Sequence, residues 1–176
     1  FLQYAGGAPA NVAVAAARLG ASSHFAGMLG RDMFGDFLLE SLQQAGVETD
    51  CIVRTDAAKT ALAFVALDAH GERSFSYWRE TSAAKGLADD PRRLAAALDS
   101  VRIAYFSGIT LAILPEPGRA RLLGALAEAR AAGTQVVFDP NLRPRLWPDA
   151  QTMRDRIEAA AGIADLVLPS FDDERD

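Results

Sequence analysis

The chain has 176 residues, half of them hydrophobic, and a formal net charge of −5 at pH 7. This length suits one domain with a sizeable core, and the negative charge argues against nucleic acid as a partner. Its apolar runs are too short to span a bilayer, and no charged leader precedes an apolar signal core. Cys51 is the only cysteine, which excludes a disulfide framework and a thiolate zinc cluster within the chain. We therefore expect a soluble, cytoplasmic protein.

The two ends of the sequence suggest that it is part of something longer. Phe1 is not a methionine, and the sequence stops at an acidic run, 172–176, just after an apolar, strand-like segment. We expect both ends to be cuts through a longer protein.

The first element is a helix that follows a glycine pair. Pro9 suits the first helical position because its missing N–H would be unpaired there, and Gly20 stands where a helix ends. Gly6 and Gly7 let the backbone approach a ligand, the helix start offers free N–H groups, and Asn11 adds an amide. The pattern predicts a site for a polyhydroxylated or anionic small molecule, although these residues alone are also typical of a tight turn.

The next segments predict one strand, one helix and an antiparallel patch. We expect a strand at 23–29 and a helix whose buried residues include Phe34, Phe37 and Leu42, ended by Gly46. Three short strands follow at 51–53, 61–67 and 74–78, with turn residues at 68–72 between the last two. Because no helix separates these three strands, they should pair as an antiparallel patch within about residues 50–80.

The second half alternates strands and helices. Helices are predicted from Pro91 to Leu98, around Leu122 to Ala129, and around Met153 to Ala160; strands are predicted at 103–106, 135–138 and 166–168. This alternation is typical of βαβ units and of a parallel sheet covered on both faces. Ligands of such sheets bind beyond the carboxyl ends of the strands.

Two further groups of residues are candidates for ligand binding. Tyr77 and Arg79 lie two apart on a predicted strand, hence on one face, although strand aromatics usually serve packing. Asn141 and Arg143 follow a buried strand directly, where a guanidinium suits bidentate recognition of carboxylate or phosphate. A proline-rich loop whose arginines pair with nearby carboxylates is the alternative. The segment 107–112 leaves another strand at the same edge, and we interpret it as a pocket wall.

Several segments together resemble a known family. Gly6-Gly7-Ala8-Pro9-Ala10-Asn11, followed by Gly27 and by Gly30-Arg31-Asp32-Met33-Phe34-Gly35, is similar to the N-terminal signature of the ribokinase family, also called the phosphofructokinase-B family. Tyr77-Trp78-Arg79, the segment 107–114 and Asn141-Leu142-Arg143-Pro144-Arg145-Leu146-Trp147 resemble the branch of that family that phosphorylates 2-keto-3-deoxygluconate.

The resemblance implies the fold, the reaction and the roles of single residues. It implies one ribokinase-like α/β domain over 1–176: a three-layer sandwich around a mostly parallel sheet, with an antiparallel β lid through which copies associate. It implies an ATP- and Mg²⁺-dependent carbohydrate kinase of an acidic sugar. The implied sugar site comprises Gly6, Gly7, Asn11, Tyr77, Arg79 and Arg143, and Asn141 and Arg143 lie toward the nucleotide phosphates.

The sequence departs from the family pattern near its end. The Asn-x-x-Glu element linked to magnesium would fall at 171–174, where only Glu174 matches, and the segment that carries the catalytic aspartate is expected beyond Asp176. We therefore name no catalytic residue and expect this chain alone to be inactive. The alternatives are a fructokinase or ribokinase-like enzyme of a neutral sugar and a non-catalytic sugar-binding module.

Overall fold

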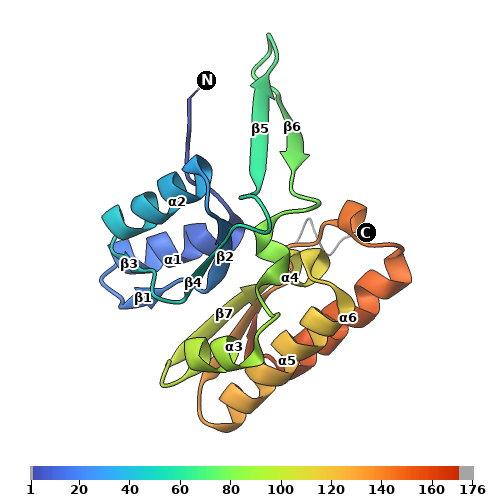
Figure 1. Cartoon of the computed structure of the whole chain (residues 1–176). Coiled ribbons are helices and arrows are strands. Elements are labelled where there is room, and N and C mark those ends of the chain that lie inside the picture. Colours follow the sequence, from blue (N-terminus) through green and yellow to red (C-terminus); the bar gives the residue numbers. More distant parts are fainter. Residues whose placement is uncertain (1, 171–176) are drawn as a thin grey trace. The chain divides into compact units, whose positions relative to one another are not determined.

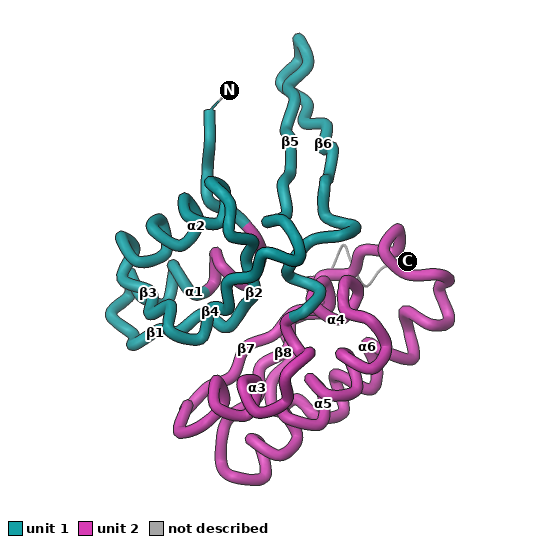
Figure 2. The backbone as a smooth tube through the Cα atoms, in the orientation of Figure 1, with its two compact units in different colours: residues 1–6, 13–86 teal, residues 7–12, 87–176 magenta. Residues whose placement is uncertain are grey.

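The computed structural model describes residues 2–170, which form two compact units (Figures 1 and 2). Unit 1 comprises residues 1–6 and 13–86, and unit 2 comprises residues 7–12 and 87–176. Helix α1 (Ala8–Arg18) begins in unit 2 and ends in unit 1. Among the described residues, no helix combines the length and the apolar character needed to cross a membrane.

Unit 1 contains two short parallel strand pairs, a second helix and the end of α1, besides an antiparallel part. Strand β1 (Ser23–His24) pairs with β3 (Val47–Glu48), and β2 (Gly27–Gly30) pairs with β4 (Ile52–Thr55). Helix α2 (Met33–Gln44) connects β2 to β3 along the chain, and Asp32 caps its N-terminus. Leu29, Leu42 and Val47 are buried between these elements.

The predicted strand at 23–29 is divided into two strands, β1 and β2. Their parallel partners, β3 and β4, are separated at the corresponding position. A turn closed by the Ile52 N–H and the Thr49 carbonyl (3.0 Å) separates β3 from β4, and β1 and β2 break opposite it. The assignment of 51–53 to the antiparallel patch was wrong. That segment belongs to β4, which lies parallel to β2 in register Gly27↔Ile52. Helix α2 lies between these two strands in the sequence and is part of their crossover connection.

The antiparallel part of unit 1 is a single hairpin. Strands β5 (Leu62–Leu67) and β6 (Arg73–Trp78) pair over their full length, from Leu62↔Trp78 to Leu67↔Arg73. Asp68 organises the turn, because its Oδ1 accepts hydrogen bonds from the N–H groups of His70 (2.8 Å) and Glu72 (2.9 Å). We call β5, β6 and their turn the hairpin. After it, the short helix η1 (Ala83–Gly86) closes the unit.

Unit 2 is a three-stranded parallel sheet with helices in its connections. The strands, in the order β7-β8-β9, are Ile103–Ser107, Gln135–Asp139 and Leu166–Val167. The remaining elements are α3 (Pro91–Leu98), α4 (Gly108–Ile113), α5 (Glu116–Ala131), η2 (Pro144–Leu146) and α6 (Ala150–Ile163). The predicted helices and strands of this half are confirmed, and α4 is an addition: the segment interpreted as a pocket wall is helical.

Alternation along the strands decides which face of this sheet is packed. Ala104, Phe106, Val136 and Phe138 point into the core, where the rings of Phe106 and Phe138 stack with centroids 4.7 Å apart. Residues of α3, α4, α5 and α6 complete that core, including Leu94, Leu111, Leu122, Leu126 and Ala160. The intervening strand residues therefore face the other side of the sheet, where the candidate site begins.

Candidate active site

The turn before α1 has the conformation that its glycines predict. Gly7 adopts φ +130°, which side-chain-bearing residues rarely adopt, and its carbonyl accepts the Asn11 N–H (2.8 Å). An added Cβ at Gly6 would meet nothing within 4 Å, and Asn11 itself is exposed. The first turn of α1 therefore presents free backbone N–H groups and the Asn11 amide.

The carboxyl ends of β7 and β8 hold a polar pair that the sequence analysis missed. The Tyr105 hydroxyl donates to Oδ2 of Asp139 (2.8 Å). Burial and this carboxylate raise the pKa of Tyr105 above its usual value, so the phenol remains protonated at neutral pH. Ser107 pairs in register with Asp139 across the two strands. Tyr105 is two residues before Ser107, so its ring lies on the same face as Asp139 and reaches it diagonally.

The loop after β8 places Asn141 at this edge. Asn141 adopts φ +38°, a left-handed conformation that asparagine tolerates better than most residues, and its amide donates to Ser107 Oγ at a long 3.4 Å. Arg143 is exposed, and its Nη1 donates to the Leu142 carbonyl (2.5 Å). The predicted position of Asn141 at the carboxyl edge is thus confirmed.

A hollow of about 500 Å³ opens beside this edge in unit 2. Its lining residues come from α1, from the face of the sheet opposite the core, and from the segment after β9: Val12, Ile103, Tyr105, Val137, Asp139 and Leu168. Most of the lining is apolar, and the Tyr105–Asp139 pair supplies its polar side chains. A carboxylate directly after a buried strand is the signal that could have pointed to Asp139.

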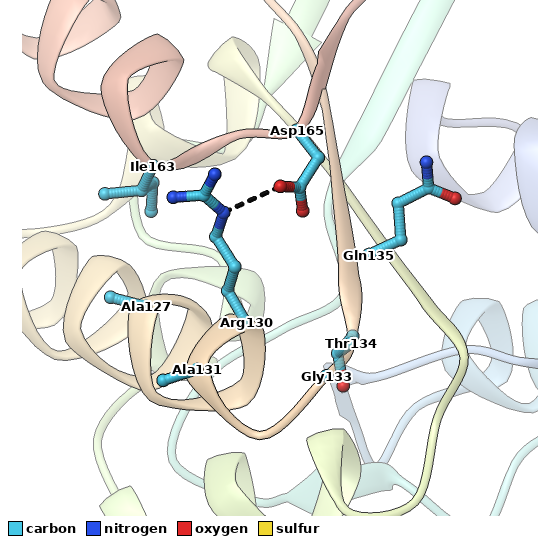
Figure 3. A pocket seen from close by; sticks show the side chains of 8 residues that line it. All are labelled: Ala127, Arg130, Ala131, Gly133, Thr134, Gln135, Ile163 and Asp165. Carbon is cyan, nitrogen blue, oxygen red and sulfur yellow. Dashed lines mark hydrogen bonds and ion pairs between the residues drawn. The ribbon is translucent and has the colours of Figure 1, made fainter.

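A second hollow, of about 690 Å³, lies at the opposite end of the strands (Figure 3). Asp165 stands in it as a structural brace, because its Oδ1 accepts from Arg130 Nε (2.7 Å) and its Oδ2 accepts from the Val136 N–H (2.9 Å). These contacts tie the start of β9 to β8 and to the end of α5. We therefore interpret this hollow as part of the scaffold.

We expect the Asp165 brace to make the stability of unit 2 dependent on pH. The hydrogen bond from the Val136 N–H and then that from Arg130 lower the pKa of Asp165. A depressed folded-state pKa contributes stability above the unfolded value of about 3.9, and that stability is lost as pH falls through the folded value. We expect Asp165→Asn to lower the melting temperature at pH 7, and this difference from wild type to disappear in acid. Asp155→Asn, at an exposed position of α6, is the control; a pH-independent difference for Asp165→Asn would contradict the assignment.

The hairpin brings Tyr77 and Arg79 together as predicted. The Arg79 guanidinium carbon lies 4.0 Å from the centre of the Tyr77 ring, a cation–π contact. Phe75, two residues before Tyr77 on the same strand, stacks with the Tyr77 ring at a distance of 6.0 Å between ring centres. Tyr77 is 47% exposed, so the pair is available to a ligand.

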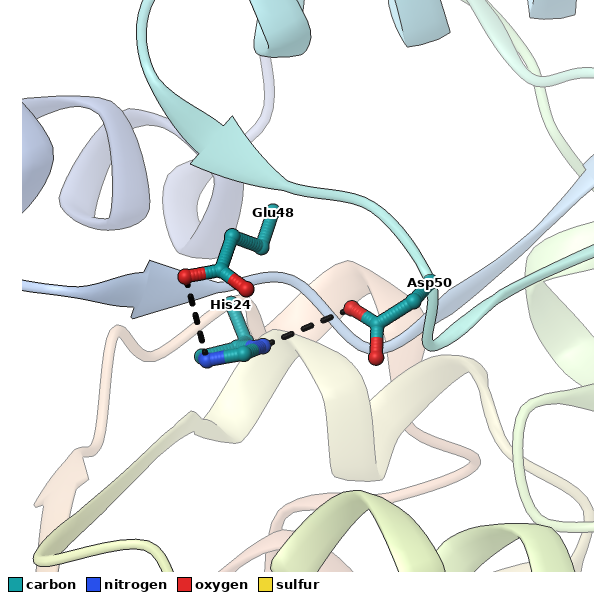
Figure 4. A group of neighbouring side chains, drawn as sticks. All are labelled: His24, Glu48 and Asp50. Carbon is teal, nitrogen blue, oxygen red and sulfur yellow. Dashed lines mark hydrogen bonds and ion pairs between the residues drawn. The ribbon is translucent and has the colours of Figure 1, made fainter.

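A cluster of His24, Glu48 and Asp50 lies on the surface of unit 1 (Figure 4). One potential ligand atom from each lies within 4.8 Å of the others. However, Nε2 of His24 faces Glu48 Oε1 (3.5 Å), whereas Nδ1 faces Asp50 Oδ1 (3.4 Å). Each ring nitrogen thus has its own carboxylate neighbour, and all three side chains are exposed. We interpret the cluster as an exposed polar network. The proposed magnesium residue, Glu174, lies outside the described residues.

Comparison with known proteins identifies this α/β arrangement. The profile of the pfkB family carbohydrate kinases matches residues 1–176. A fructokinase from Xylella fastidiosa, solved with bound ATP, superimposes with a TM-score of 0.82 and is 46% identical, covering 95% of this chain and 52% of that chain. Fructokinase-2 of Solanum lycopersicum is 41% identical over 97% of this chain and 51% of its own length. The 2-dehydro-3-deoxygluconokinase of Dickeya dadantii (strain 3937) is 39% identical over 86% of this chain and 49% of its own length.

The chain therefore belongs to the pfkB family of carbohydrate kinases, and its fold is ribokinase-like. It spans about half the length of the curated relatives that it matches.

Proposed function

We propose that this chain is the sugar-binding part of an ATP-dependent sugar kinase, and that both units belong to one ribokinase-like domain. The family match over residues 1–176 carries the proposal. The position of Asn141 at the carboxyl edge of a parallel sheet supports it, because ligands of such sheets bind there.

The nucleotide contacts that we propose come from the loop after β8. The Asn141 amide and the exposed Arg143 guanidinium both offer N–H donors, which suit phosphate oxygens. Magnesium, when bound, would neutralise charge on the transferred phosphoryl group, whereas the described residues position the substrates. The need for ATP favours the cytoplasm as the place of action.

For the phosphoryl acceptor we propose 2-keto-3-deoxygluconate, a keto sugar that carries a carboxylate. The argument rests on the pairing of Arg79 with Tyr77, because a guanidinium held by an aromatic face can make charge-assisted hydrogen bonds to a carboxylate. Arg143 is the second cation proposed for this end of the sugar. The 39% identity to a kinase named for this substrate agrees with the assignment.

Fructose is the second candidate acceptor, because two fructokinases are 46% and 41% identical to this chain. Both candidates are keto sugars, but the acidic one carries a carboxylate and lacks the 3-hydroxyl of fructose. The test is a coupled ATP-consumption assay of the whole protein with 2-keto-3-deoxygluconate, fructose and ribose. A higher kcat/KM for the acidic sugar supports the first candidate, and a higher value for fructose supports the second. No turnover with any sugar would favour a non-catalytic binding module.

Substitution of Asn11 tests the turn before α1 as a sugar site. If the Asn11 amide bonds sugar hydroxyls, Asn11→Ala leaves them unpaired and should weaken sugar binding by about 1 to 3 kcal/mol. Because Asn11 is exposed and lies in a helix, the melting temperature should change little. The measurements are KM for the sugar and thermal unfolding. A lowered melting temperature with an unchanged KM would instead assign Asn11 to the turn alone.

We also propose that two copies associate through the hairpin. Its large apolar side chains are exposed over both strands, namely Phe64, Val65, Leu67, Phe75 and Trp78. Such a surface and two open strand edges favour association. Light scattering of the whole protein tests this, and a monomeric mass would count against it.

A further inference from the structure

The hairpin has little packing that would fix its direction. All side chains of β6 are exposed, and in β5 only Leu62 is partly buried. An isolated two-stranded hairpin is marginally stable in water, and its orientation depends on what holds its base. The base of the hairpin therefore decides where Tyr77 and Arg79 lie.

Backbone contacts join the two ends of the hairpin to each other. Lys59 forms a parallel bridge with Ser82, and the Lys59 carbonyl accepts the Ala83 N–H (2.9 Å). Ser82 and Ala83 are both buried. The segment leading into the hairpin and the segment leaving it thus form one base.

Asp32 connects this base to helix α2 with both of its carboxylate oxygens. Oδ1 accepts the Gly35 N–H (2.8 Å) as the N-cap of α2, and Oδ2 accepts the Thr60 N–H (2.9 Å), two residues before β5. Thr60 is 8% exposed, and its Oγ1 accepts the Gly30 N–H (3.1 Å). These contacts therefore join the segment 30–35 to Thr60, which lies 28 residues beyond Asp32.

The two glycines of the motif keep these segments close enough for the carboxylate to reach both. A Cβ on Gly30 would overlap Asp32 Oδ2 and would lie 2.8 Å from the backbone of Ala58 and Thr60. A Cβ on Gly35 would overlap the Gly30 carbonyl oxygen and would lie 2.8 Å from Thr60 Oγ1. The spacing Gly30-Arg31-Asp32-Met33-Phe34-Gly35 therefore leaves room for the two hydrogen bonds of Asp32 at the base of the hairpin.

The charge state of Asp32 agrees with this arrangement. Burial raises the pKa of this carboxyl, but the hydrogen bonds from Thr60 and Gly35 outweigh burial and lower its pKa below the usual value. The carboxylate is therefore ionised at neutral pH, and hydrogen bonds to a charged acceptor are stronger than those to a neutral one.

We propose that Asp32 is a positioning residue: its carboxylate clamps Thr60 to the start of α2 and thereby fixes the direction in which the hairpin presents Tyr77 and Arg79. The link to the sugar rests on the proposed function, whereas the clamp itself does not. Asp32 is not proposed to touch the substrate.

The substitution Asp32→Asn separates the clamp from the helix cap. Asparagine is as good an N-cap as aspartate, so α2 retains its first turn. Its single oxygen can replace only one of the two carboxylate oxygens, so its amide nitrogen would face the other N–H donor. Asp32→Ser is the second variant: serine is also a good N-cap, but its single hydroxyl oxygen leaves the Thr60 N–H without its acceptor.

The test measures the distance between a spin label on the hairpin turn and one on α1 within unit 1. Labels at His70→Cys and Arg18→Cys are exposed, and Cys51→Ser removes the native thiol. We expect a narrow distance distribution for the parent chain and broader distributions for Asp32→Asn and Asp32→Ser. Asp149→Asn, which changes the N-cap of α6 in unit 2, is the matched control and should leave the distribution unchanged. Unchanged widths in both Asp32 variants would overturn the proposal, and Asp32→Ser decides alone if Asp32→Asn does not fold.

A kinetic measurement on the whole kinase links the clamp to the sugar. We expect Asp32→Asn to raise KM for the sugar by roughly fivefold, the effect expected from the loss of one hydrogen bond. The decrease in kcat should be smaller than this change in KM. Loss of kcat with unchanged KM would contradict a positioning role. If the whole protein phosphorylates no sugar, the proposed function fails, and the distance measurement still decides the clamp.

Discussion

Replacement of Arg79 by alanine in the whole kinase should lower kcat/KM for 2-keto-3-deoxygluconate by roughly ten- to a hundredfold. A guanidinium that bonds the sugar carboxylate makes charge-assisted hydrogen bonds worth about 1.5 to 3 kcal/mol, and about 1.4 kcal/mol corresponds to a factor of ten. The carboxylate is remote from the transferred phosphoryl group, so the loss should appear mostly in KM. Lysine should rescue only part of it, because an ammonium cannot make the planar two-point contact.

The hairpin offers a matched control for this substitution. Arg73 begins β6 and lies on the same strand face as Tyr77, the residue on which Arg79 stacks; Arg73 is also exposed. Arg73→Ala therefore removes a cation from the same surface without removing the one that stacks on Tyr77. If Arg79→Ala and Arg73→Ala have equal effects, or if Arg79→Ala impairs fructose as much as the acidic sugar, the acidic-sugar assignment is wrong and fructose takes its place.

Local signals in the sequence predicted most element boundaries. Gly20, Gly46 and Gly133 each follow a helix with positive φ, and Pro91 opens α3 behind the capping Asp90. These signals depend on the conformation of one or two residues, so a single sequence reveals them. Strand pairing depends instead on residues far apart in the sequence. For this reason β4 was assigned to the wrong sheet, since its parallel partner β2 lies on the other side of helix α2 in the sequence.

The same reasoning explains which site residues were missed. Asn141 and Arg79 stand in motifs that can be read locally, and both were predicted. The Tyr105–Asp139 pair depends on the register of two strands 34 residues apart, and the Asp32–Thr60 contact spans 28 residues. Helix α4, of only six residues, is too short to show a helical period. What the sequence left open is therefore the contact between distant segments.

We predict opposite effects on stability for two glycine-to-alanine substitutions in unit 2. One glycine lies where α4 approaches the loop after β8, and the other lies where there is room for a side chain. Gly108, the buried first residue of α4, leaves no room for a Cβ, which would overlap the Pro140 carbonyl oxygen and lie 3.0 Å from Ile157 Cδ1. Gly108→Ala must therefore displace α4 or the loop that carries Asn141, and overpacking of this kind costs about 1 to 3 kcal/mol. Gly124, exposed in α5, has nothing within 4 Å of an added Cβ. Gly124→Ala should stabilise unit 2 by about 0.5 to 1 kcal/mol, because alanine loses less backbone entropy in a helix.

Urea unfolding followed by the fluorescence of the buried Trp147 measures both effects in unit 2, with Trp78→Phe removing the tryptophan of the hairpin. If the loop is displaced, Gly108→Ala should also weaken ATP binding in the whole kinase, since we propose that Asn141 contacts the nucleotide. Gly124→Ala should leave ATP binding unchanged. A Gly108→Ala protein as stable as its parent would show that the loop can move away from α4 freely, and Asn141 would then have no fixed position from which to bind phosphate.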